Sequence, residues 1–150
     1  EAAIGFNEYY VQLFANLPHA KRDKVMETLK TVNLEAKTHT PAGQLSHGQK
    51  QWLEIGMLLV QTPELLLLDE PVAGMSRAER DRTGELLSQI ENGCSILVIE
   101  HDMLFVRQFA STTTVLHQGR VLREGLIADI QNDPEVKEVY LGHNHQKKTN

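Results

Sequence analysis

A run of four leucines, Leu65 to Leu68, ends in two adjacent acids, Asp69 and Glu70, and no other segment constrains the fold as tightly. Prolines at positions 63 and 71 bracket this run, so it is too short for an ordinary helix. Apolar character without alternation is typical of a parallel strand that is buried on both faces. The segment therefore predicts a central strand of a parallel sheet.

The residues that follow this strand predict a strand–helix–strand unit. Residues 77–90 are polar with one apolar edge, which predicts a helix, and residues 95–99 are β-branched and strand-like. Two parallel strands joined by a crossover helix define the α/β class. Hydrophobic spacing elsewhere predicts helices at 4–17, 19–34, 46–62, 103–110 and 133–141, a loop at 35–44, and a hairpin of strands 113–117 and 120–123 that closes the edge of the sheet.

Composition excludes several classes of protein. The 150 residues carry 41% hydrophobic and 23% charged side chains, a globular balance that excludes a disordered chain. The formal net charge of −5 argues against a dedicated nucleic-acid binder. The single cysteine, Cys94, cannot form an internal disulfide, which favours a reducing compartment inside the cell. No apolar run approaches the roughly 20 residues that cross a bilayer.

Two places in the chain carry chemistry. Ligands of parallel α/β sheets bind beyond the carboxyl ends of the strands, where Asp69 and Glu70 are expected. One carboxylate there can hold a Mg²⁺ ion while its neighbour orients and deprotonates a water molecule. At Ser46 a helix is predicted to begin, and its free N–H groups, partial positive charge and serine hydroxyl suit a phosphate. The structural alternatives are two acids that solubilise a strand end and an ordinary N-capped helix.

Four motifs occur in a fixed order: LSHGQ at 45–49, the strand ending in DE at 65–70, VAGMS at 72–76, and His101. They resemble the LSGGQ signature, hydrophobic DE strand, D-loop and switch histidine in the second half of an ATP-binding cassette (ABC) transporter ATPase. The resemblance implies ATP and Mg²⁺ as ligands, Glu70 and His101 as catalytic residues, and Asp69 as the metal ligand. The implied nucleotide contacts are Leu45, Ser46, His47, Gly48 and Gln49, which act in trans on ATP held by an opposite subunit, and Ala73, Gly74, Met75 and Ser76 of the D-loop.

Within that family the chain is most similar to importers of urea, amides and branched-chain amino acids. Runs such as LSHGQKQWLEIGMLL and DEPVAGM carry this similarity. His47 stands where the family usually has glycine, and the resemblance assigns it to the urea-type branch. Ser76 stands where the D-loop usually ends in aspartate, so any contact that this carboxylate makes across an interface is weakened or replaced.

No G-x-x-x-x-G-K-[ST] loop occurs in the chain. We therefore expect an incomplete P-loop NTPase fold of the ABC type, with a mostly parallel sheet flanked by helices, part of the helical subdomain, and no Walker A lobe. The expected division is a partial helical subdomain with the signature at 1–62, the C-terminal part of the nucleotide-binding core at 63–141, and a tail at 142–150. Such a C-terminal fragment alone is expected to be inactive, because the phosphate loop supplies most of the binding of the triphosphate.

The resemblance also implies partners and a place in the cell. The partners are a second ATPase subunit, transmembrane permease subunits and the missing Walker A lobe, with no nucleic acid, at the cytoplasmic face of the membrane. One alternative is the C-terminal lobe of a chromosome-maintenance or repair ATPase, which needs a heptad coiled coil before the signature, whereas residues 1–40 predict two short helices divided by Pro18. A non-catalytic interaction module is the other alternative.

Overall fold

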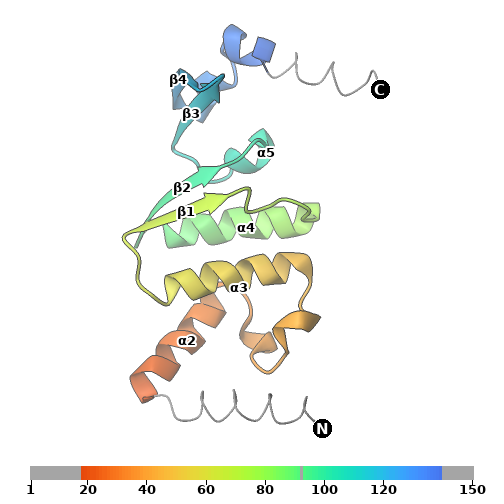
Figure 1. Cartoon of the computed structure of the whole chain (residues 1–150), viewed down its shortest axis with the longest axis vertical. Coiled ribbons are helices and arrows are strands. Elements are labelled where there is room, and N and C mark those ends of the chain that lie inside the picture. The colour runs from red at the N-terminus through yellow and green to blue at the C-terminus, as the bar shows by residue number, and fades with distance from the viewer. Residues whose placement is uncertain (1–17, 92, 140–150) are drawn as a thin grey trace. The chain divides into compact units, whose positions relative to one another are not determined.

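The computed structural model describes residues 18–91 and 93–139, and the chain divides into two compact units between Ile99 and Glu100 (Figure 1). The helix predicted at 4–17 and the tail predicted at 142–150 lie outside the described residues. Within the described part, no helix combines the length and the apolar character needed to span a membrane.

Three helices dominate the first unit: α2 (His19–Thr31), α3 (His47–Leu59) and α4 (Arg77–Ile90). All three were predicted. Helix α2 ends earlier than its apolar pattern suggests because Asn33 adopts a left-handed φ of 57° and the Leu34 amide donates to the Leu29 carbonyl at 2.7 Å. The predicted loop that follows contains two 3₁₀ turns, η1 (Glu35–Lys37) and η2 (Ala42–Gln44).

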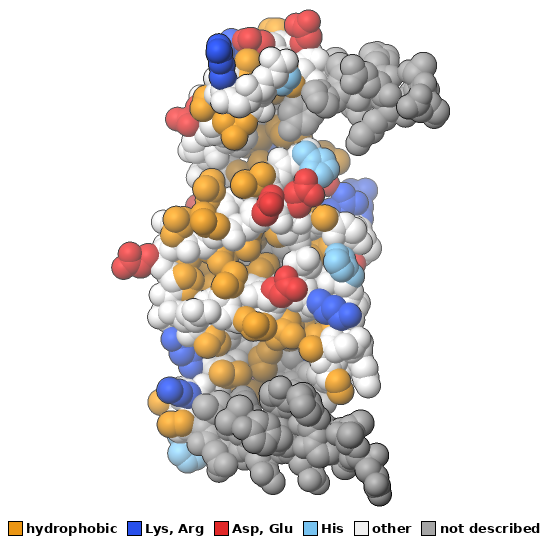
Figure 2. Space-filling model, in the orientation of Figure 1, with side chains coloured by type: hydrophobic (Ala, Val, Ile, Leu, Met, Phe, Trp, Pro, Cys, Tyr) orange, Lys and Arg blue, Asp and Glu red, His pale blue; other side chains and the backbone are white. Residues whose placement is uncertain are grey.

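Strands β1 (Leu65–Asp69) and β2 (Ser95–Ile99) pair in parallel, with α4 as their crossover, which confirms the predicted unit. Their register places Asp69 opposite Ile99. Leu66 and Leu68 are buried, whereas the alternate leucines of β1 are 53% and 62% exposed, so the prediction that the run is buried on both faces is wrong. Among the described residues, this exposed face consists of Leu65, Leu67, Leu97 and Ile99, and apolar side chains are visible over the strands in Figure 2.

Helices α3 and α4 are joined by a buried hydrogen bond. The indole Nε1 of Trp52, on α3, donates to Oγ1 of Thr83, on α4, at 2.9 Å. Thr83 is 0% exposed and Trp52 4% exposed, so neither group exchanges this partner for water. The two helices therefore hold a fixed register, which sets where their N-terminal ends meet.

The second unit contains α5 (Met103–Val106), β3 (Thr112–His117), β4 (Arg120–Leu126) and α6 (Ile127–Ile130), and residues 134–139 are also helical. The predicted hairpin is present, and Gln118 and Gly119 both have positive φ, as its tight turn requires.

One expectation for this unit needs correction, and one helix was not predicted. The hairpin forms a two-stranded antiparallel sheet, and its apolar side packs in a cluster with Ile130 and Val136. That it closes the edge of the sheet of the first unit stays a prediction. Helix α5 is one turn long, since the chain continues beyond Val106 as hydrogen-bonded turns. The rings of Phe105 and Phe109 still lie in tilted contact, with their centroids 4.9 Å apart. Helix α6 was not predicted, because one turn carries too little periodicity to detect.

Candidate functional site

The two predicted carboxylates lie at the carboxyl end of β1. Asp69 is the last residue of the strand and continues its exposed face, and Glu70 follows it. Asp69 also lines a hollow of about 200 Å³ together with Gln51 and Glu54 of α3. Both carboxylates are therefore accessible to a ligand from solvent.

Glu70 has an unusual backbone conformation. Its φ is 45°, in the left-handed region that residues with a side chain avoid at a cost of about 1–2 kcal/mol. Two hydrogen bonds hold it there: its amide donates to the Ile99 carbonyl at 2.9 Å, and its own carbonyl accepts from the Ala73 amide at 3.0 Å. Strain of this kind is concentrated at functional positions, which is consistent with the role predicted for this residue.

The LSHGQ segment forms the beginning of α3. Ser46 is the N-cap, and its Oγ accepts from the Gln49 amide at 3.2 Å while the Gln49 side chain accepts from the Ser46 amide at 3.0 Å. This reciprocal capping box leaves the amides of His47 and Gly48 without an acceptor inside the helix. The predicted helix start is confirmed, and its first turn has the donors that an anion needs.

The VAGMS segment ends at a second capping box. Ser76 is the N-cap of α4, its Oγ accepts from the Glu79 amide at 3.3 Å, and its own amide donates to Glu79 Oε2 at 3.0 Å. Ser76 therefore ends the segment as a helix cap in this chain.

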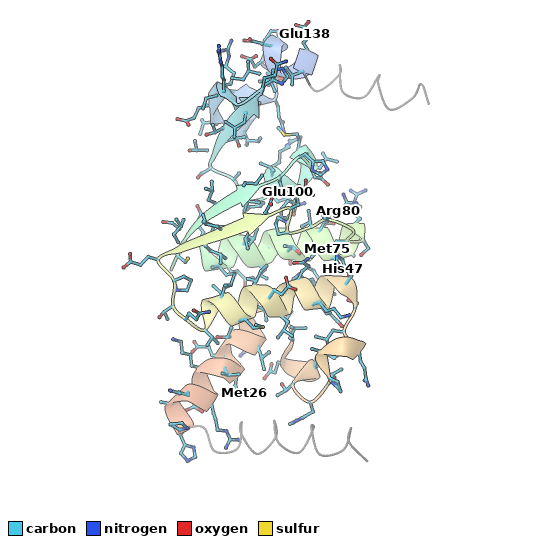
Figure 3. All side chains as sticks on the ribbon, viewed as in Figure 1. Met26, His47, Met75, Arg80, Glu100 and Glu138 are labelled. Atoms are coloured by element: carbon cyan, nitrogen blue, oxygen red, sulfur yellow. The ribbon has the colours of Figure 1, made fainter. Side chains whose placement is uncertain are left out.

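The LSHGQ and VAGMS segments are in contact, although the two residues that bond, His47 and Ala73, are 26 residues apart in the sequence. His47 Nε2 lies 3.0 Å from the Ala73 carbonyl oxygen, and Ser46 Oγ donates to Glu79 Oε1 at 3.2 Å. Figure 3 shows the labelled His47 and Met75 at the same end of the α3–α4 pair. The structure thus brings the predicted signature and D-loop residues into one cluster.

Members of this cluster differ in accessibility. Ser46, His47, Ala73 and Gly74 are exposed, whereas Leu45 and Met75 are 8% and 6% exposed. The side chains of these two apolar residues therefore serve packing. Gly48 is buried beneath Glu79, since a Cβ added to it would lie 2.5 Å from Glu79 Oε1. A larger residue at this position would push the carboxylate aside.

His101 belongs to the second unit, so its placement relative to Asp69 and Glu70 stays a prediction. The side chain of His101 is 76% exposed and that of the neighbouring Glu100 3% exposed, with 3.9 Å between Nδ1 and Oε2. Glu100 Oε2 also accepts from the His101 amide at 3.0 Å, which fixes the backbone on which the imidazole stands.

Two residues that connect α3 and α4, Glu79 and Thr83, were not predicted from the sequence. The spacing of Ser76 and Glu79 is that of a capping box, a signal that could have been used. The pKa of Glu79 is lowered, first by hydrogen bonds from Ser76 and then by Ser46 and the charge of His47. The contact between Glu79 and Ser46 joins residues 33 positions apart, and no sequence pattern predicts it.

Asp69 and Glu70 provide some, but not all, of the oxygen ligands that a magnesium ion needs. Among the residues that the structure describes, no group of three His, Cys, Asp or Glu side chains could hold a metal by itself. Mg²⁺ is commonly held by one or two carboxylates together with water and substrate phosphates. The exposed pair Asp69 and Glu70 fits that partial donor set and would depend on the substrate to complete it.

Comparisons with known proteins show what the chain is similar to. The family model described as ABC transporter matches residues 3–73. The branched-chain amino acid transport ATP-binding protein BraF of Pseudomonas aeruginosa is 36% identical over 116 residues, covering 76% of this chain and 46% of BraF. LivG of Salmonella typhimurium, which has the same description, is 35% identical over 122 residues, covering 80% of this chain and 48% of LivG.

A solved structure gives the same result. The crystal structure of the ADP conformation of MJ1267, an ATP-binding cassette of an ABC transporter, superposes with a TM-score of 0.75 at 28% identity, covering 84% of this chain and 52% of the other. The fold is thus an α/β nucleotide-binding fold of the ATP-binding cassette type. The chain belongs to the ABC transporter family and spans about half the length of the curated relatives it matches.

Proposed function

We propose that the chain is part of the ATP-hydrolysing subunit of an ABC importer. The observation that carries this proposal is the cluster at the N-termini of α3 and α4, where the signature residue His47 contacts Ala73 of the D-loop at 3.0 Å. The accessible Asp69–Glu70 pair beyond β1 adds the hydrolytic chemistry. The similarity to transport ATP-binding proteins supports the same function.

Each residue has a role in this proposal. Glu70 orients the attacking water and accepts its proton, and Asp69 holds Mg²⁺, which neutralises charge on the phosphates when bound. His101 donates a hydrogen bond to the γ-phosphate. Ser46 and Gly48 bind the γ-phosphate of ATP held by an opposite subunit, through the hydroxyl and the first-turn amides of α3. The complete site therefore needs two subunits and a Walker A lobe.

For the cargo, we propose branched-chain amino acids or urea and related amides. BraF and LivG are branched-chain amino acid transport proteins, which supports the first. The similarity of runs such as DEPVAGM to the urea-type branch, which includes His47 as a feature of that branch, supports the second. Uptake of labelled leucine and labelled urea by the assembled importer would distinguish these cargoes. The subunit would act with permease subunits at the cytoplasmic face of the membrane.

The test is ATP hydrolysis by a complete subunit that joins this chain to a Walker A lobe. Glu70→Gln should lower the rate by at least about 100-fold, since general-base catalysis commonly contributes that much. Glu85→Gln, at an exposed position of α4, is the matched control and should leave the rate unchanged. A Glu70→Gln subunit that is as active as the control would refute the role of Glu70, and turnover by the isolated chain would refute its dependence on the missing lobe.

A further inference from the structure

The carboxylate of Glu79 serves the N-caps of two different helices. Its Oε2 accepts from the Ser76 amide at 3.0 Å and from the Ser76 hydroxyl at 2.8 Å, at the start of α4. Its Oε1 accepts from the Ser46 hydroxyl at 3.2 Å, at the start of α3. One side chain thereby connects the signature segment with the end of the D-loop.

The hydroxyl of Ser46 has only one proton to give. Its oxygen accepts from the Gln49 amide at 3.2 Å, and its proton points to Glu79 Oε1. An anion that receives a hydrogen bond from this hydroxyl must therefore take it from Glu79. The negative charges of the anion and of the Glu79 carboxylate would also repel each other if both lay within hydrogen-bonding distance of the Ser46 hydroxyl.

The Glu79 carboxylate also fills the space beside the first turn of α3, so an anion that binds there must displace it. Glu79 Oε1 and Cδ would lie 2.5 and 2.7 Å from a Cβ placed on Gly48, so the carboxylate rests directly against the first turn of the helix. The hydrogen bonds from Ser76 and Ser46 lower its pKa, and it is therefore ionised at neutral pH. An internal anion already occupies one side of the helix N-terminus.

We propose that Glu79 is a positioning residue that links the signature segment to the D-loop: a phosphate that binds Ser46 displaces the Glu79 carboxylate and so loosens the cap at Ser76. The inference rests on the proposed function, because that function makes Ser46 the phosphate contact. Occupancy of one nucleotide site is thereby transmitted to residues 72–76, which lie next to Glu70. The signal is a change of hydrogen-bond partner and requires no movement of α3 relative to α4.

The test needs no nucleotide and uses the whole chain. In NMR titrations of the labelled protein, Ser46→Ala should raise the pKa of the Glu79 carboxyl and shift the amide signals of residues 73–76. Ser88→Ala is the control, because the Ser88 hydroxyl donates to the Gly84 carbonyl within α4 at 3.1 Å and does not reach the cluster. A purely structural role for Ser46 as a helix cap would leave the pKa of Glu79 unchanged.

Two further variants make the result decisive. Ser46→Asp keeps a good N-cap if the alanine variant does not fold, and its carboxylate stands in for the anion, so it should also displace Glu79 and shift the amides of residues 73–76. In a Glu79→Ala background, neither substitution at Ser46 should move those amides. Shifts that persist in that background, or no shift in either variant, would overturn the link. Failure of phosphate to bind α3, with the shifts present, would instead refute the proposed function alone.

Discussion

Replacing Thr83 with valine tests the buried bond that fixes α3 against α4. Valine has nearly the same shape as threonine but no hydroxyl, so the Trp52 indole N–H loses its acceptor at 2.9 Å in a place that water does not reach. The Thr83 hydroxyl also lies 2.8 Å from the Glu79 carbonyl, which keeps its ordinary helical partner after the substitution.

The expected loss of stability follows from the unsatisfied donor. A buried polar group left without a partner costs about 1–3 kcal/mol, and we expect Thr83→Val to lower the free energy of unfolding by about 2 kcal/mol. With a urea dependence of about 1–3 kcal/mol per molar for a small protein, the midpoint should fall by about 1 M. Trp52 is the sole tryptophan, so its fluorescence reports on this contact directly.

A double-mutant cycle separates the hydrogen bond from the shape of the side chain. Trp52→Phe removes the donor, and in that background Thr83→Val should cost at least about 1 kcal/mol less than in the wild type. Because this background lacks the tryptophan, all four proteins are followed by far-ultraviolet circular dichroism. An equal cost of Thr83→Val in both backgrounds would show that the bond contributes nothing and that the reasoning is wrong.

Three other predictions concern different parts of the chain. Gly74→Ala should cost about 1 kcal/mol in urea unfolding because its φ is +72°, whereas Gly43→Ala, with open space and no positive φ, should cost nothing. The hydrogen bond from Arg123 holds the pKa of the Asp133 carboxyl below its ordinary 3.8, so this group stabilises the fold above pH 3.8, and that stabilisation is lost as the pH falls through the lowered pKa. Asp133→Asn should remove this part of the acid dependence, measured by acid titration of the circular dichroism signal. The exposed apolar sheet face predicts self-association of the chain, and Leu67→Lys should weaken it in sedimentation velocity; identical profiles would contradict this.

The elements of the first unit were predictable because their signals are local. A serine followed by periodic apolar residues marks the start of α3, and a leucine run between prolines marks β1. The order strand, helix, strand along the chain is then enough to predict that β1 and β2 lie parallel in one sheet, with α4 as their crossover. Exposure of one face of β1 was not predictable, because an apolar run has the same letters whether one face or both are covered.

The candidate site was predictable only in part. The motif residues could be identified from order and spacing, and the structure places Ser46 and Ser76 at helix starts as cap residues. What the sequence lacks is the pairing of these two starts. The bonds from Ser46 to Glu79 and from His47 to Ala73 depend on how α3 packs against α4, and that register is set by buried side chains distant in sequence.

The left-handed backbone at Glu70 has a consequence for evolution. Glycine would occupy this conformation without the penalty that a side chain incurs, so the chain retains a glutamate where a more stable sequence is available. Selection for thermal resistance alone should therefore recover Glu70→Gly, whereas selection that also demands hydrolysis should reject it. If hydrolysis by the carboxylate is the reason that a strained glutamate is retained, a library screened for thermal resistance alone and one screened for hydrolysis as well should differ first in the residue at position 70.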